Sequence, residues 1–135
     1  MSDLLLDTHI FLWLMNGDQK LNKKNQERIE KAVNSGAGIR LSAISIWEIG
    51  MLVTKQRIML SQPVDKWIDQ AIEISSVKII ELSNEILLDS CSLLGQFHGD
   101  PADRMIVATS RIKRIPLITQ DEKILSHIEN GFCLK

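Results

Sequence analysis

The sequence predicts a three-layer α/β/α sandwich with a central parallel sheet. Two observations carry this prediction. Short apolar stretches of strand length alternate with longer stretches of helical period along the 135 residues. Most of the apolar stretches are also followed within a few residues by a helix-start signal. Parallel strands joined through helices form right-handed crossovers, so this alternation produces a sheet with helices on both faces.

Five apolar stretches are predicted to be strands. Each is short and bounded by polar or turn-forming residues, which is typical of buried strands. In chain order they are Leu4–Leu6, Ile39–Ala43, Val77–Leu82, Ile115–Thr119 and Phe132–Leu134. The first four alternate with helices and are expected to form the parallel sheet, and the fifth would add a last strand.

Seven helices are predicted from apolar spacing and capping residues. They span Thr8–Met15, Asn22–Ser35, Ile44–Val53, Pro63–Ser75, Ser83–Phe97, Asp100–Arg114 and a short segment after Asp121. The second helix is polar, with Ile29 and Val33 one turn apart at i and i+4. Ser45 is expected to cap the third, which places Glu48 in its first turn.

Composition indicates one soluble globular domain over residues 1–135, expected in the cytoplasm. The net charge is −1, with 16 basic and 17 acidic residues, so charge alone does not indicate a nucleic-acid partner. The two cysteines, Cys91 and Cys133, are far apart, which favours free thiols over a disulfide scaffold or a zinc site. No signal peptide or membrane-spanning run is expected.

Four acidic residues follow the predicted strands or begin the helices after them. They are Asp7, Glu48, Asp103 and Asp121. The carboxyl ends of parallel strands share one edge of a sheet, so these side chains could converge there. Clustered carboxylates repel one another unless a cation neutralises them. Oxygen ligands without cysteine or histidine favour Mg²⁺ or Mn²⁺ over zinc.

Helix capping is the alternative explanation for each acid taken singly, because carboxylates at helix N-termini accept free N–H groups. Asp100 is best explained in this way, since Pro101 at the first helical position completes a strong start signal. Glu48 resists the explanation because it is embedded in the apolar run "AISIWEIGMLV". Spacing alone therefore leaves capping and metal binding both open.

Four sequence blocks follow one another from Leu4 to about Leu125: "LLLDTHIFLW", "LSAISIWEIGML", "HGDPADRMIVATS" and "IPLITQDEKI". These blocks resemble, in the same order, those of PIN-domain ribonucleases, and most closely those of the VapC toxins of bacterial toxin–antitoxin pairs. The resemblance implies a PIN-like fold whose metal-binding catalytic acids are Asp7, Glu48, Asp103 and Asp121. It makes Asp100 an auxiliary acid or a cap, and Thr119 a polar neighbour of the site.

The resemblance also implies an activity and partners. A Mg²⁺- or Mn²⁺-dependent endoribonuclease would hydrolyse RNA by metal-activated water, leaving a 5′-phosphate and a 3′-hydroxyl. A cognate antitoxin would neutralise this toxin, and a homodimer is expected. Arg104, beside Asp103, is the best candidate for a phosphate contact, unless it pairs with a carboxylate. The resemblance places the antitoxin in a groove along Ile44–Val53, whereas the sequence alone favours core burial for that helix.

Two other classes of protein fit the pattern of acids less well. A haloacid-dehalogenase-type phosphohydrolase expects Asp-x-Asp after the first strand, but the chain has Asp7-Thr8-His9. A receiver-like or otherwise non-catalytic binding module would want paired acids there, although Lys123 is loosely placed for a receiver. The intact set of four acids argues against a PIN fold kept only for binding.

Histidines and tryptophans are predicted to be structural. His9, His98 and His127 share no metal-ligand spacing. The three tryptophans, Trp13, Trp47 and Trp67, lie in apolar helical contexts that favour core or interface positions. The chain has no Tyr and only three Phe, so few aromatic side chains are available for base stacking.

Overall fold

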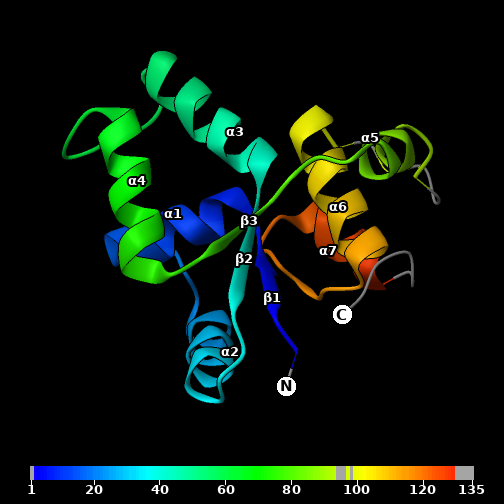
Figure 1. Ribbon diagram of the computed structural model, residues 1–135, viewed down its shortest axis with the longest axis horizontal. Helices are drawn as coiled ribbons and strands as arrows, with labels where there is room; N and C mark the ends of the chain where they lie inside the picture. The colour runs from blue at the N-terminus through cyan, green and yellow to red at the C-terminus, as the bar shows by residue number, and fades with distance from the viewer. Residues whose placement is uncertain (1, 94–96, 98, 130–135) are drawn as a thin grey trace.

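A four-stranded parallel sheet forms the centre of the molecule in a computed structural model that describes residues 2–93, 97 and 99–129 (Figure 1). The strand order is β3-β2-β1-β4, and every neighbouring pair is parallel. The strands are β1 (Leu4–Leu6), β2 (Ile39–Ser42), β3 (Lys78–Ile80) and β4 (Leu117–Ile118). The predicted fold class is confirmed.

Helices cover both faces of this sheet. They are α1 (Thr8–Asn16), α2 (Lys23–Asn34), α3 (Ala43–Thr54), α4 (Val64–Ser75), α5 (Asn84–Cys91), α6 (Pro101–Lys113) and α7 (Glu122–Glu129). In Figure 1, helices α1 to α4 lie to one side of the strands and α5 to α7 to the other. Two hydrophobic clusters follow this division, one on each face of the sheet.

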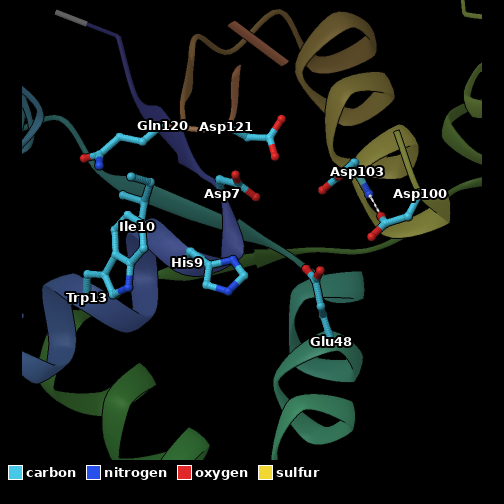
Figure 2. A pocket seen from close by; sticks show the side chains of 9 residues that line it. All are labelled: Asp7, His9, Ile10, Trp13, Glu48, Asp100, Asp103, Gln120 and Asp121. Atoms are coloured by element: carbon cyan, nitrogen blue, oxygen red, sulfur yellow. Dashed lines mark hydrogen bonds between the residues drawn. The ribbon is translucent and has the colours of Figure 1, made fainter. Parts of the chain in front are cut away.

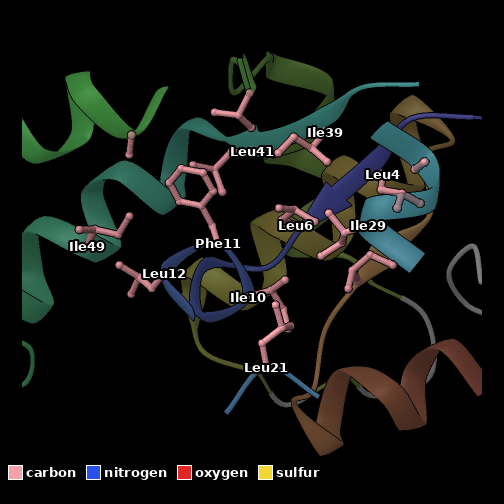
Figure 3. Packing of buried hydrophobic residues seen from close by; sticks show 14 of the residues in the cluster. Leu4, Leu6, Ile10, Phe11, Leu12, Leu21, Ile29, Ile39, Leu41 and Ile49 are labelled. Carbon is pink, nitrogen blue, oxygen red and sulfur yellow. The ribbon is translucent and has the colours of Figure 1, made fainter. Parts of the chain in front are cut away.

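The central strand β1 explains why its sequence is apolar at every position. Successive strand side chains point to opposite faces. Leu4 and Leu6 join the cluster under α1 to α4, and Leu5 joins the cluster under α5 to α7. Figure 3 shows Leu4 and Leu6 among the buried side chains of the first cluster, which include Phe11 and Ile29. A strand covered on both faces has no side that can be polar.

Strand register brings the strand ends together. Leu6 pairs with Leu41 of β2 on one side and with Ile118 of β4 on the other. The residues that follow these strands therefore emerge at one edge of the sheet. The amide of Asp7 continues the ladder by donating to the Ile118 carbonyl at 3.0 Å.

The start of α3 differs from the sequence prediction. Ser42 caps this helix by accepting a hydrogen bond from the Ile44 amide at 3.2 Å, and the helix begins at Ala43. Ser45, the predicted cap, is buried inside the helix, and Glu48 lies in its second turn. Two serines three residues apart carry the same local signal, so tertiary contacts decide between them.

Other element bounds were predicted too long. The second, third and fourth strands end before Ala43, Leu82 and Thr119, and α5 ends at Cys91 rather than near Phe97. The predicted strand at Phe132–Leu134 lies outside the described residues. Within the described ranges, no helix is both long and apolar enough to span a membrane.

The outer face of α3 is more exposed than the sequence suggested. Only Ser45 and Ile49 of this helix are buried, and the Trp47 side chain is 57% exposed. A groove of about 230 Å³ runs beside this face. Its lining comprises Trp47, Glu48, Met51, Leu52, Lys55, Arg57, Asp100, Pro101 and Ala102. The preference of the sequence alone for core burial is therefore wrong for this outer face of the helix.

A matched pair of substitutions in α2 tests the packing. Ile29 is 2% exposed, whereas Val33, one turn further along the helix, is 49% exposed. Ile29→Ala should lower the free energy of unfolding by about 2–5 kcal/mol, because it removes a fully buried side chain. Val33→Ala should change it by less than about 0.5 kcal/mol. Urea unfolding of both variants measures the difference, and equal losses would contradict this packing.

Candidate active site

The carboxylate of Asp7 is buried where β1 ends and α1 begins. Its side chain is 6% exposed and caps α1, with Oδ1 accepting from the Thr8 amide at 2.8 Å. Oδ2 accepts from the hydroxyl of Thr119 at 2.7 Å, so the expected polar neighbour is in place. Burial raises the pKa of the Asp7 carboxyl above its ordinary value, although these two hydrogen bonds oppose the shift.

Glu48 reaches the same edge from the second turn of α3. The hydroxyl of Thr8 hydrogen-bonds Glu48 Oε1 and lies 2.7 Å from the hydroxyl of Ser45. This contact ties α1 to α3 and orients the glutamate. Burial is the main reason that the pKa of Glu48 is raised, and the charge of Asp7 adds to it.

Asp100 and Asp103 come from the start of α6. Asp100 Oδ1 caps the helix by accepting from the Asp103 amide at 2.9 Å, and Pro101 occupies the first turn. The capping role expected for Asp100 is confirmed. Its carboxylate also belongs to an acidic group: in the part of the chain that the structure describes, Glu48, Asp100 and Asp103 offer oxygens that all lie within 4.8 Å of one another.

Asp121 lies at the rim of the site. Its Oδ1 accepts from the amides of Lys123 at 2.9 Å and Ile124 at 3.1 Å, so it caps the start of α7. The side chain is exposed. Its negative charge nevertheless raises the pKa values of Asp7 and Asp103, which places it within electrostatic reach of both.

The electrostatic centre of the site is Asp103. Its pKa is raised to about 7, first by burial and then by the charges of Asp100, Asp7, Asp121 and Glu48. Each of the other acids in the cluster thus contributes to this shift. At neutral pH a carboxyl with this pKa is about half protonated, and a bound cation would favour its charged form.

A cavity of about 380 Å³ connects these side chains (Figure 2). Its lining comprises Asp7, His9, Ile10, Trp13, Glu48, Asp100, Asp103, Gln120 and Asp121. Among the described residues that line it, none is Lys or Arg. Carboxylate oxygens are hard donors, and the set holds no cysteine, so it fits a divalent cation such as Mg²⁺ or Mn²⁺ and not a zinc site.

Arg104 was expected to contact phosphate or pair with a carboxylate, but its observed bonds are different. Nε donates to the Ser90 carbonyl at 2.8 Å, and Nη1 donates to the Phe97 carbonyl at 2.7 Å. These bonds fasten the end of α5 and Phe97 to α6. Arg104 thus supports the helix that carries Asp103.

Two supporting residues were missed as such by the sequence analysis. Thr8 and Ser45 position Glu48, yet Thr8 was noted only as part of "DTH" and Ser45 only as a cap. A signal was present in the spacing, because residues three apart on a helix share a face, as Ser45 and Glu48 do. The partner on α1 could not be identified from that spacing.

The family of the chain follows from comparison with known proteins. The model of the PIN domain family matches residues 4–130. The chain therefore belongs to the PIN-domain family. Over 127 residues it is 32% identical to Ribonuclease VapC22 of Mycobacterium tuberculosis (strain ATCC 25618 / H37Rv), a match that covers 94% of this chain and 93% of that protein.

Two solved structures share the fold. VapBC2 from Rickettsia felis, bound to a DNA fragment from its promoter, matches with a TM-score of 0.66 at 17% identity, covering 92% of each chain. A toxin–antitoxin complex from Klebsiella pneumoniae matches with a TM-score of 0.61 at 22% identity, covering 93% of this chain and 92% of that one. PIN nucleases are metal-dependent, and this chain carries an acidic cluster suited to a cation.

The raised pKa of Asp103 predicts that the metal-free protein loses stability as pH rises through about 7. The folded state holds the proton of Asp103 up to about pH 7, whereas the unfolded chain releases it near 3.8. Unfolding therefore releases protons between these values, and stability falls as pH increases. Thermal melts in EDTA should show a lower melting temperature at about pH 8 than at about pH 5.5.

Asp103→Asn and added Mn²⁺ are the controls for that measurement. His127 acts in the opposite direction, because burial lowers its pKa, so the informative quantity is the difference between wild type and Asp103→Asn. The variant should melt with a weaker loss toward high pH. Mn²⁺ at 100 times its Kd should stabilise the wild type by about 2.7 kcal/mol. Identical pH profiles, or no response to millimolar Mn²⁺, would count against this electrostatic description.

Proposed function

We propose that the protein is a metal-dependent endoribonuclease of the VapC type, acting as the toxin of a toxin–antitoxin pair. One observation carries the proposal: five carboxylates from four separate segments of a PIN-domain chain line one cavity at the carboxyl edge of the sheet. The similarity to Ribonuclease VapC22 supports RNA as the substrate.

The proposed ligand and catalytic set is Asp7, Glu48, Asp103 and Asp121, with Asp100 as an additional acid. Mg²⁺ or Mn²⁺ held there would activate water for in-line attack on phosphorus and neutralise charge on the departing oxygen. Thr119 and the Thr8 amide fix the two oxygens of Asp7. The Thr8 hydroxyl fixes Glu48, so these carboxylates are positioned before substrate arrives.

An antitoxin partner is supported by the fold shared with the two toxin–antitoxin complexes. The groove beside α3 is the proposed docking place for a segment of that partner. It is lined by apolar side chains such as Trp47 and Met51, and it shares Glu48 and Asp100 with the acidic cavity. A segment lying in the groove would reach the carboxylates and cover them.

The competing functions lose support from the family assignment. A haloacid-dehalogenase-type phosphohydrolase and a receiver module are other families, and the chain belongs to the PIN-domain family. A PIN fold kept only for binding would have no need of mutually repelling carboxylates. Asp103, with its pKa raised to about 7 by burial and by four acids, is costly to maintain without a cation.

Isosteric amides test the acids one at a time. Asp7→Asn and Asp103→Asn should each lower cleavage of a mixed RNA pool in Mg²⁺ or Mn²⁺ by about 100-fold or more, because they remove charge that holds the cation. Asp100→Asn should keep the helix cap, since Asn caps as well as Asp. Its cleavage activity should fall by only about tenfold. Gel analysis with an EDTA control measures cleavage.

Asp65→Asn is the matched control for these variants. Asp65 is an exposed acid in the first turn of α4 that does not line the cavity, so the same change of charge should leave cleavage unaltered. Melting curves of each variant establish that it is folded. Full activity in Asp7→Asn or Asp103→Asn would refute the proposed site.

We also propose a homodimer formed through the α3–α4 side of the molecule. Met59 is 95% exposed and lines a mostly apolar cavity of about 520 Å³ together with Val53, Ile58 and Leu60. Ile74 of α4 is 67% exposed. Sedimentation at tens of micromolar should show a dimer. Met59→Glu should shift it toward monomer, while Leu88→Glu, an equally conspicuous exposed apolar site on α5, should not. A monomeric wild type would remove this part of the proposal.

A further inference from the structure

We propose that Trp13, with His9 beside it, forms the wall of the cavity that receives a nucleobase next to the scissile phosphate. This inference rests on the proposed function and names two positioning residues outside the carboxylate set. The apolar sequence context of Trp13 predicts a position in the core or an interface. The structure instead places it, with His9, in the lining of the acidic cavity.

The two rings lie one helical turn apart on the same face of α1. Their centroids are 5.7 Å apart and their planes are inclined by 49°. Trp13 is half-buried and packs against the core with part of its surface, while His9 is exposed. The tryptophan is therefore supported from behind, which holds a large aromatic surface in place at low entropic cost.

The cavity has two chemically distinct ends. Figure 2 shows Asp103, Asp100 and Glu48 toward one side, and Trp13, Ile10 and Gln120 toward the other. His9 lies between them, and its charge lowers the pKa values of Asp7 and Glu48, which places it near both carboxylates. A cation with its bound phosphate matches the first end. The aromatic end could bind a flat, weakly polar group that is linked to that phosphate through a few covalent bonds.

A nucleobase is the group of this kind that RNA carries. Single-stranded nucleic acid is bound by proteins through its backbone charge together with stacking of bases on aromatic side chains. Stacking tolerates all four bases because each has a π face. The wall formed by Trp13 and His9 therefore accounts for how a nucleotide could be held in orientation without a sequence-reading set of hydrogen bonds.

The backbone around the wall is fixed by hydrogen bonds from distant parts of the chain. Gln120, another lining residue, accepts from the Asn22 amide at 2.8 Å and donates to the Lys20 carbonyl at 2.9 Å. The amide of Asp18 donates to the Trp13 carbonyl at 2.9 Å. The backbone of Lys20 is therefore held beside Gln120 at the aromatic end of the cavity.

Trp67 provides the contrast of a tryptophan with a packing role. It is 6% exposed, meets Phe11 edge-on and lies outside the acidic cavity. A conservative change there alters packing without touching the proposed wall. Trp67→Phe is therefore the matched control for changes at Trp13.

Intrinsic fluorescence tests the contact directly. A hexamer of oligoadenylate RNA, added in Ca²⁺ to provide a hard cation in place of Mg²⁺, should quench tryptophan emission of the wild type and of Trp67→Phe. The quenching should vanish in Trp13→Phe, which keeps a ring but loses the fluorophore. A length-matched oligomer of abasic tetrahydrofuran phosphate has the same charge and no bases. It should not quench the emission of the wild type or of Trp67→Phe.

Affinity gives the second, independent measurement. Trp13→Leu should weaken binding of the oligoadenylate hexamer by about tenfold or more, as expected for the loss of one base stack. Trp13→Phe should lose less affinity for the hexamer, because a smaller ring remains. The loss in His9→Ala should lie between those of Trp13→Phe and Trp13→Leu. The Mn²⁺ affinity of Trp13→Leu and Trp13→Phe, measured by calorimetry, should stay within twofold of wild type, since neither change alters the carboxylates or the charge near them.

The outcomes separate this inference from the proposed function. Metal-dependent RNA cleavage by the wild type, with quenching and affinity unchanged in the Trp13 variants, overturns the wall and leaves the nuclease standing. Base-dependent quenching by Trp13 without any cleavage supports the wall and overturns the nuclease. Loss of RNA binding accompanied by an equal loss of Mn²⁺ affinity, or by unfolding in both Trp13→Phe and His9→Ala, shows a structural role and overturns the wall.

Discussion

The buried carboxylate of Asp7 is the interaction on which the rest of the site depends. It follows the central strand, so both neighbouring strands end beside it. One oxygen begins α1 through the Thr8 amide, and the other holds Thr119 at the end of β4. Thr8 in turn contacts Glu48 on α3. A single acidic side chain thus sets the start of one helix and, through its neighbours, the relative placement of α1, α3 and β4.

Repulsion between carboxylates is the constraint that accompanies this arrangement. Three of the acids offset it locally: Asp7, Asp100 and Asp121 accept backbone N–H bonds at the starts of α1, α6 and α7. Helix N-termini carry partial positive charge, which favours anions there. The pKa of Asp103, raised to about 7 by burial and by the charges of its neighbours, shows that repulsion remains in the cluster. Two hydrophobic clusters, one on each face of the sheet, stabilise the fold and offset the cost of the repelling carboxylates.

Strong local signals made much of the fold predictable. Three leucines running into an acid located β1 and the cap of α1, and Asp100-Pro101 located the start of α6. The convergence of the acids followed from parallel topology, without knowledge of any contact. Their catalytic assignment came from family resemblance and stays a prediction.

Features decided by long-range contacts were not predictable. Thr8 reaches residues 37 and 40 positions away, and no periodicity encodes that contact. The same contact involves Ser45, which lies inside α3 while Ser42 caps it. Arg104 finds two carbonyls through the path of the chain after α5. Trp13 has an apolar sequence context like that of Trp67, and only the packed structure distinguishes the cavity wall from the core.

Anomalous X-ray diffraction from crystals soaked in Mn²⁺ tests the central claim most directly, because it locates the cation without depending on activity. The account predicts a manganese peak in the acidic cavity, coordinated by carboxylate oxygens from the cluster around Asp103, and loss of that peak in Asp103→Asn. A fully soaked crystal with no peak in the cavity, or with manganese bound only elsewhere on the protein, would contradict it.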